Sequence, residues 1–126
     1  MFVQIAIRNG EPAQVRCKIA GVVQMALREA LGVDIKPFCI RLAEEANGIQ
    51  DGCAGGIRIA ILVIAAEQLA AAKKRRLFGR IAEIASLELN IAHDEIITGV
   101  IETAAENWSN GYGERQWLQY LSYQLP

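Results

Sequence analysis

Two glutamates occupy places in the sequence where carboxylates could act as an acid and base pair. Glu44 and Glu102 each end an apolar, strand-like segment, and they lie 58 positions apart. Paired carboxylates divide general acid and general base roles when their surroundings give them different pKa values. Glutamates at strand ends more often face water, however, so this pattern by itself does not predict catalysis.

Metal-binding residue types are present but badly spaced. His93 is the single histidine, and it is followed directly by Asp94 and Glu95. Adjacent side chains do not converge easily on one ion, and there is no second histidine to complete a set of ligands. We therefore predict no metal site and interpret these three residues as a loop or cap before a strand.

The cysteines indicate reduced thiols. Their number is odd and their spacing includes no C-x-x-C motif, which favours neither a disulfide framework nor a zinc site. Cys17 lies between two basic residues, a setting that would favour a reactive thiol if it were exposed, but cysteine is commonly a small buried hydrophobe. We expect core thiols in a cytoplasmic protein at all three positions: Cys17, Cys39 and Cys53.

Charge and hydropathy exclude several other classes of partner. The net charge is -1 and the pI is about 5.8, so there is no electrostatic reason to expect nucleic acid or an anionic membrane. The basic run at residues 73–76 points around most of a helix and predicts a solvated surface. The longest apolar run, residues 59–66, is too short for a bilayer, and we expect no leader. Gly52, Gly55 and Gly56 precede a strand instead of following one, so we predict no cofactor.

The elements that position these residues follow from periodicity. Residues 2–7 are β-prone, and a turn containing Gly10 and Pro12 leads into a helix that Gly32 terminates. A second strand is predicted at residues 37–43. The pattern then recurs, with a strand at 57–65, a helix at about 69–87 and a strand at 96–102.

An offset of 58 aligns the two halves, pairing Ile5 with Val63 and Ile19 with Leu77. We therefore predict an α/β fold of two tandem βαβ units, in which a four-stranded sheet carries both helices on one face. The expected organisation is a single domain with repeats at about 1–56 and 57–104. A C-terminal hairpin or tail would occupy residues 105–126.

The predicted third strand is apolar on both sides, which leaves the sheet face without helices uncovered. Ile59, Ile61 and Val63 point one way, and Leu62 and Ile64 point the other. A hydrophobic content of 52% is high for a monomer of 126 residues. We expect other copies of the chain to cover the open face, with the aromatic tail reaching between subunits.

The C-terminal segment carries a family resemblance. It reads Glu106-Asn107-Trp108-Ser109 and continues with Gly111, Gly113, Glu114 and Gln116. This resembles the carboxyl-terminal signature of the tautomerase superfamily, in its malonate semialdehyde decarboxylase-like branch. The resemblance implies two βαβ units, a homotrimer that buries the free sheet face, and pockets between subunits. Asn110 and Tyr112 stand where the family usually has phenylalanine and asparagine.

The family's catalytic amino-terminal proline is missing. The resemblance implies a proline whose secondary amine serves as acid or base, but this chain begins Met1-Phe2. Counting back from Gly10 without a gap places Met1 at the proline position, so a primary α-amine would stand there. An unperturbed α-amine titrates at about 7.7 to 8.0, which leaves it available as a weak base or imine-forming nucleophile if it is buried.

The other groups that the resemblance implies are also missing. Decarboxylase-like members place an aspartate before the second strand and arginines after the third, but this chain has Lys36-Pro37-Phe38 and Ala65-Ala66-Glu67-Gln68 there. A developing negative charge would lack its cationic clamp.

We therefore predict a divergent member that has lost the proline-dependent reaction. It would bind a small carboxylated molecule at an intersubunit pocket or serve as an assembly module. The alternative is an active tautomerase, hydratase or decarboxylase on small 2-oxo or unsaturated acids, using the Met1 α-amine as its one catalytic candidate together with relocated arginines. The predicted pocket residues are Met1, Phe2, Arg8, Arg41, Arg58, Trp108 and Tyr112.

Overall fold

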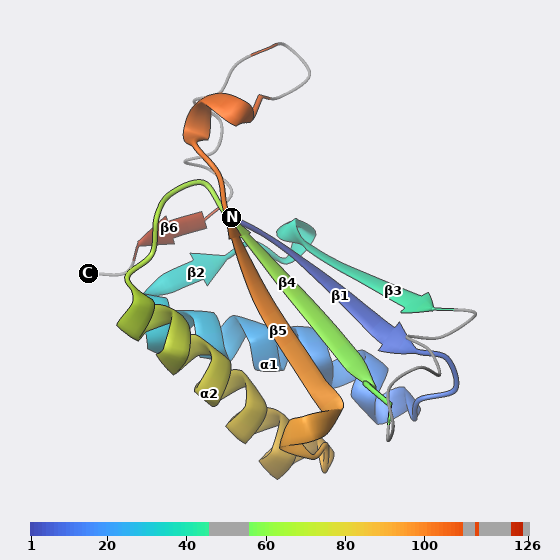
Figure 1. Ribbon diagram of the computed structural model, residues 1–126. Helices are drawn as coiled ribbons and strands as arrows, with labels where there is room; N and C mark the ends of the chain where they lie inside the picture. Colours follow the sequence, from blue (N-terminus) through green and yellow to red (C-terminus); the bar gives the residue numbers. More distant parts are fainter. Residues whose placement is uncertain (46–55, 110–112, 114–121, 125–126) are drawn as a thin grey trace.

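The computed structural model describes residues 1–45, 56–109, 113 and 122–124. A four-stranded sheet carries two long helices on one of its faces (Figure 1). The strands and α-helices are β1 (Phe2–Arg8), α1 (Ala13–Leu31), β2 (Val33–Ile35), β3 (Ile40–Glu45), β4 (Ile59–Ala65), α2 (Ala71–Leu89), β5 (Ile96–Glu102) and β6 (Ser122–Gln124). Short 3-10 helices are η1 (Pro37–Cys39), η2 (His93–Glu95) and η3 (Ala105–Asn107).

The sheet consists of two parallel pairs joined back to back. The strand order is β3-β1-β4-β5, with β1 parallel to β3, β4 parallel to β5, and the central strands β1 and β4 antiparallel. Each parallel pair is connected by its own helix, as a parallel connection requires. The predicted fold class of two βαβ units with both helices on one face is confirmed.

The two helices match closely in sequence position. Ala71 and Leu89, which bound α2, follow Ala13 and Leu31 of α1 by 58 positions each. Both helices end in a left-handed residue, Gly32 with φ 65° and Asn90 with φ 54°. These are the two residue types that adopt this conformation most readily, and they release the chain toward the sheet.

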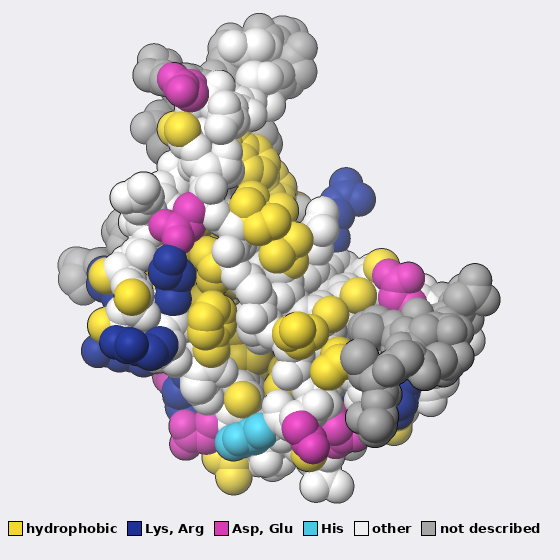
Figure 2. Space-filling view, viewed as in Figure 1, with side chains coloured by type: hydrophobic (Ala, Val, Ile, Leu, Met, Phe, Trp, Pro, Cys, Tyr) yellow, Lys and Arg dark blue, Asp and Glu magenta, His cyan; other side chains and the backbone are white. Residues whose placement is uncertain are grey.

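One sheet face forms the core with the helices. Alternate residues of the central strands are fully buried there: Val3, Ile5 and Ile7 of β1, and Ile59, Ile61, Val63 and Ala65 of β4. The intervening residues face the side without helices, where the described residues provide little cover. The expected two-sided apolar character of β4 is therefore observed, and Figure 2 shows hydrophobic side chains in an interrupted band along the strands.

Three features differ from the sequence prediction. Cys17, expected as a core thiol, is exposed, because it lies on the solvent side of α1 between the exposed residues Arg16 and Lys18, whereas Cys39 is buried and Cys53 lies outside the described residues. The strand expected from residue 37 begins at Ile40, because Pro37 opens the 3-10 turn η1 and lacks a backbone N–H for the ladder. Strand β2 was not predicted at all. It pairs antiparallel with β6, so the described end of the tail lies against its own chain. No helix in the described ranges is long and apolar enough to cross a membrane.

Candidate functional site

Met1 lies at the end of the sheet where β1 begins and β4 and β5 finish (Figure 1). Its neighbour Phe2 pairs with Ile64, which brings the amino terminus close to the loop after β4. Met1 is only 8% exposed and its side chain belongs to the hydrophobic core. The terminal amine is thus held at the edge of the core instead of extending into solvent.

Burial changes the acidity of this amine. Removal from water lowers the pKa of the Met1 ammonium from its ordinary value of 8.0, because the charged form loses hydration. The Cys39 thiol, where it is ionised, and the Glu67 carboxylate oppose that shift in the pKa. A larger share of the amine is therefore neutral near pH 7 than in an exposed chain terminus, and a neutral amine can accept a proton or attack a carbonyl carbon.

Phe2 and Trp108 form the aromatic part of this end of the molecule. Their rings stack with centroids 5.4 Å apart and an interplanar angle of 12°. The turn η3 places Trp108, whose backbone N–H donates to the Ala105 carbonyl over 3.2 Å. The indole Nε1–H is buried and has no acceptor among the residues that the structure describes. Tyr112, also predicted for the pocket, lies outside the described residues.

Glu67, whose carboxylate acts on the Met1 amine, also lines a hollow of about 250 Å³ on the helix side of the sheet. The hollow lies between the end of α1 and the start of α2, and it is lined by Leu31, Val33, Leu69 and Lys73 besides Glu67. A carboxylate and an ammonium therefore line one small cavity, and the same Glu67 carboxylate acts on the Met1 amine. Sequence reasoning treated Lys73 only as part of a solvated basic run.

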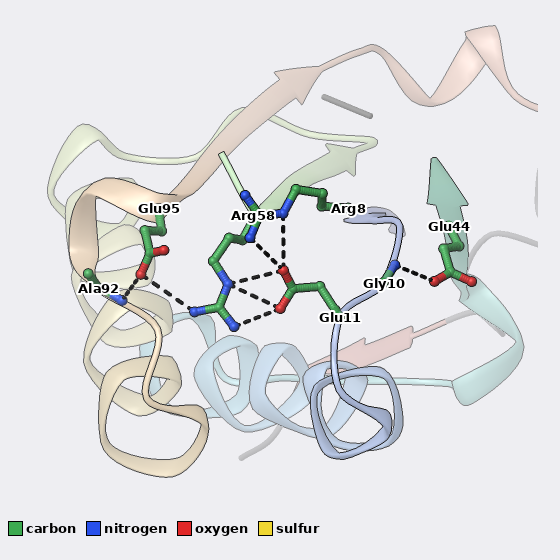
Figure 3. A network of polar contacts seen from close by, with 7 residues as sticks. All are labelled: Arg8, Gly10, Glu11, Glu44, Arg58, Ala92 and Glu95. Atoms are coloured by element: carbon green, nitrogen blue, oxygen red, sulfur yellow. Dashed lines mark hydrogen bonds and ion pairs between the residues drawn. The ribbon is translucent and has the colours of Figure 1, made fainter. Parts of the chain in front are cut away.

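Two of the predicted arginines lie at the opposite end of the sheet. Arg8 ends β1 and Arg58 directly precedes β4, and both bind the carboxylate of Glu11 (Figure 3). Arg58 Nη2 donates to Glu11 Oε1 over 2.6 Å, and Arg8 Nε donates to Glu11 Oε2 over 3.2 Å. Within one chain the structure therefore does not bring Arg8 and Arg58 together with Met1.

The Glu11 cluster, defined as Arg8, Glu11, Arg58 and Glu95, has its charges matched. Glu11 is 5% exposed, and the hydrogen bond from Arg58 is the largest cause that lowers its pKa. Glu95 Oε1 lies 3.5 Å from Arg58 Nη1 and also accepts from the Ala92 N–H over 2.9 Å. Two guanidinium groups and two carboxylates balance here, which suits a structural junction better than anion binding.

Arg41 occupies a third place, on the open face of the sheet. Register places it beside Gln4, and the adjoining row across the strands is Ala43, Ala6, Ala60 and Ile97. Three alanines in a row leave the face hollowed, and a cavity of about 540 Å³ lies there. Arg41 forms no ion pair with the described residues.

Three residues were not among the predicted pocket residues. Glu11 binds the arginines at one end of the sheet, and Cys39 and Glu67 act on the Met1 amine at the other. Glu11 precedes Pro12 in a turn, which gave no sign that two arginines would converge on it. The only available signal was the β1–β4 pairing, which brings Arg8 and Arg58 together. In the described part of the chain, no group of three His, Cys, Asp or Glu side chains is arranged to hold a metal ion.

Comparison with known proteins identifies the fold. No protein-family model and no curated protein sequence matches the chain. Among solved structures, a malonate semialdehyde decarboxylase has a TM-score of 0.76 at 14% identity, covering 95% of this chain and 98% of its own. A malonate semialdehyde decarboxylase inhibited by 3-bromopropiolate has a TM-score of 0.76 at 21% identity, covering 95% and 96%. A fused 4-OT solved as a symmetric trimer has a TM-score of 0.73 at 17% identity, covering 90% and 97%.

These structural neighbours are tautomerase superfamily members, as the C-terminal signature predicted. The chain has the fold of that superfamily over nearly its whole length.

Proposed function

We propose that the chain binds a small carboxylated molecule beside the Met1 amine, at a site completed by neighbouring copies in a homotrimer, and has lost the proline-dependent reaction of the superfamily. One observation carries this proposal. The family resemblance implies arginines in the loop after β4. In this chain the carboxylate of Glu67 acts on the Met1 amine from that loop. Without a cation beside the amine among the described residues, a developing oxyanion lacks preorganised cationic stabilisation from that part of the chain.

The open sheet face supports the homotrimer. Ile97, which lines the cavity on that face, is 55% exposed, and Ile101, on the same face of β5, is 48% exposed. Contiguous apolar surface of this kind usually meets another protein surface. The resemblance to a fused 4-OT solved as a symmetric trimer supports the same arrangement. An assembly module without a ligand would use this surface alone.

Two cations are suited to bind the ligand carboxylate. Lys73 lines the hollow that Glu67 joins to the Met1 end. Arg41 lies on the open face and would approach the site of a neighbouring copy when the face is covered. We therefore expect Lys73→Met and Arg41→Met to weaken carboxylate binding about tenfold, the loss of one charge-assisted contact. Arg76→Met removes a charge from the outer surface of the same helix and is the matched control.

The lowered pKa of the amine favours a second candidate, an enzyme acting through Met1. A partly neutral primary amine can form an imine with a 2-oxo acid or work as a base in tautomerisation, hydration or decarboxylation. The arginines would then come from neighbouring copies.

Reductive trapping and calorimetry separate the two candidates. The folded protein is incubated with pyruvate or malonate semialdehyde and a borohydride, and peptide mass locates any adduct; binding of the same acids is measured without reductant. Binding without an adduct supports the leading proposal. An adduct confined to Met1, and lost when the chain is unfolded first, supports the enzyme. Neither binding nor adduct contradicts both and leaves an assembly role.

A further inference from the structure

A second nucleophile lies next to the amino terminus. Strands β1 and β3 run parallel with Val3 opposite Ile40, so Cys39, directly before β3, borders the first residues of β1. Paired strands lie about 4.8 Å apart. That register puts Cys39 opposite Phe2, the residue next to Met1, and the Met1 ammonium and the Cys39 thiol each act on the other's pKa.

The thiol is shielded from solvent. Cys39 is 0% exposed, and burial raises the pKa of its thiol, which the Met1 ammonium and Lys36 oppose. A buried thiol of this kind resists direct attack by reagents in solution. It can still react with a carbon atom that the neighbouring amine has already captured, because that carbon is then delivered inside the core.

We propose that the Met1 amine and the Cys39 thiol capture small aldehydes together, as a cyclic N,S-acetal that links residues 1 and 39. The amine nitrogen attacks the carbonyl carbon, and the resulting carbinolamine loses water to give an imine. The Cys39 sulfur then bonds to the imine carbon while the thiol proton moves to nitrogen. In total, one aldehyde, one amine and one thiol give the acetal and one water, with no oxidant or reductant.

A separate observation points to a ligand at the same end. The Trp108 indole N–H is buried without an acceptor among the described residues, beside the Phe2 ring that follows Met1. An unpaired buried donor is costly, and an oxygen atom of a bound aldehyde acid would satisfy it. This inference rests on the imine-forming candidate of the proposed function and adds a stable, reductant-independent end state to it.

The test uses the full-length protein with formaldehyde or glyoxylate and no reductant, followed by intact mass and peptide mapping. With formaldehyde we expect a gain equal to one carbon atom, and a cross-linked peptide pair containing Met1 and Cys39. Cys39→Ala should abolish the cross-link, whereas Cys17→Ser, which alters an exposed cysteine, should not affect it. With glyoxylate, Trp108→Phe should lower the yield several-fold, and with formaldehyde it should have little effect.

Failure of this inference is distinguishable from failure of the proposed imine chemistry. Borohydride trapping of Cys39→Ala should still label Met1, because the amine reacts first. A Met1 adduct without any link to Cys39 in the unaltered chain overturns the N,S-acetal and leaves the imine candidate intact. The absence of a Met1 adduct in both proteins overturns both.

Discussion

The two ends of the sheet, one with the Glu11 cluster and one with Met1, are built by the same βαβ repeat but carry different charged groups. With the offset of 58 positions, Glu11 of the Glu11 cluster corresponds to Leu69 at the Met1 end. One end therefore has matched ion pairs, and the other holds the Met1 amine with the Glu67 carboxylate acting on it. The difference shows how a duplicated unit can provide a charge-matched junction at one sheet end and a buried chain terminus at the other.

The strand-end glutamates Glu44 and Glu102 make equivalent contacts in the two halves. Glu44 accepts from the Gly10 N–H and pairs with Arg16, both at 3.3 Å. Glu102 accepts from the Leu69 N–H at 2.8 Å and pairs with Lys74 at 2.5 Å. Each glutamate ties its strand end to the start of the preceding helix, so these carboxylates have a structural role in both halves.

Breaking the Glu11 cluster should have the largest effect. Glu11→Gln leaves Arg58 without its main carboxylate in a largely buried place, and we expect a loss of about 3 kcal/mol in the free energy of unfolding. Glu44→Gln, which weakens an exposed pair in the same half, should cost less than about 1 kcal/mol. Urea denaturation of both variants measures this difference, and equal losses would contradict a special role for Glu11.

Acid should remove the same contribution. The pKa of Glu11 in the folded chain lies below its ordinary value of 4.5, so its stabilising effect is complete above pH 4.5 and is lost as the pH falls through the lowered value. The stability difference between the unaltered chain and Glu11→Gln should therefore shrink toward zero in acid. A difference that stays constant down to pH 2 would mean that the pKa of Glu11 is the same in the folded and unfolded chains, which contradicts a lowered pKa in the folded chain.

Substitutions at the equivalent helix ends, Gly32 and Asn90, should change stability by smaller amounts. Gly32→Ala places a side chain on a left-handed residue with φ 65°, and we expect a loss of about 1 kcal/mol. Asn90→Gly changes the equivalent residue to the other type that accepts this conformation, so stability should change by less than about 0.5 kcal/mol. Thermal denaturation measures both, and a tolerated alanine at position 32 would argue against the shared cap.

The smallest expected effect is the difference in stability loss between the two strand-end ion pairs, Lys74–Glu102 and Arg16–Glu44. Lys74→Met should lower the urea midpoint more than Arg16→Met, because the side chains of the Lys74–Glu102 pair are less exposed than those of the Arg16–Glu44 pair. Added salt should reduce the Arg16 effect first, since exposed pairs are screened more strongly. A larger loss for Arg16→Met would reverse the order of the two halves.

Sequence periodicity was sufficient for the fold because burial repeats with strand and helix geometry. Ile59 to Ala65 alternates between two apolar faces, and the helix that follows carries one apolar stripe, so both elements and their duplication were visible. Strand β2 was not visible, because three residues show no period and its partner β6 is 87 positions away in sequence, from Val33–Ile35 to Ser122–Gln124.

The site was harder to predict than the fold. The correspondence of Met1 to the superfamily's proline stays a prediction that rests on the count back from Gly10. The sequence did not show that, within one chain, Arg8 and Arg58 lie at the other end of the sheet from Met1, because this follows from the direction of the strands. Strand β1 carries Arg8 to the opposite end of the sheet from Met1, and the antiparallel strand β4 starts at that same end. Glu11 forms ion pairs with both arginines, and no short sequence pattern predicts these side-chain contacts.

The most direct test of the account is the pH dependence of Met1 labelling. A trace amount of acetic anhydride acylates neutral amines, and peptide mass after digestion gives the rate at the amino terminus in folded and urea-unfolded chains, with the lysines as internal reference. We expect the midpoint for Met1 to lie at lower pH in the folded chain, because burial lowers the pKa of its amine. An equal or higher midpoint in the folded chain would mean a solvated or ion-paired terminus, and would contradict the placement of function at this end of the sheet.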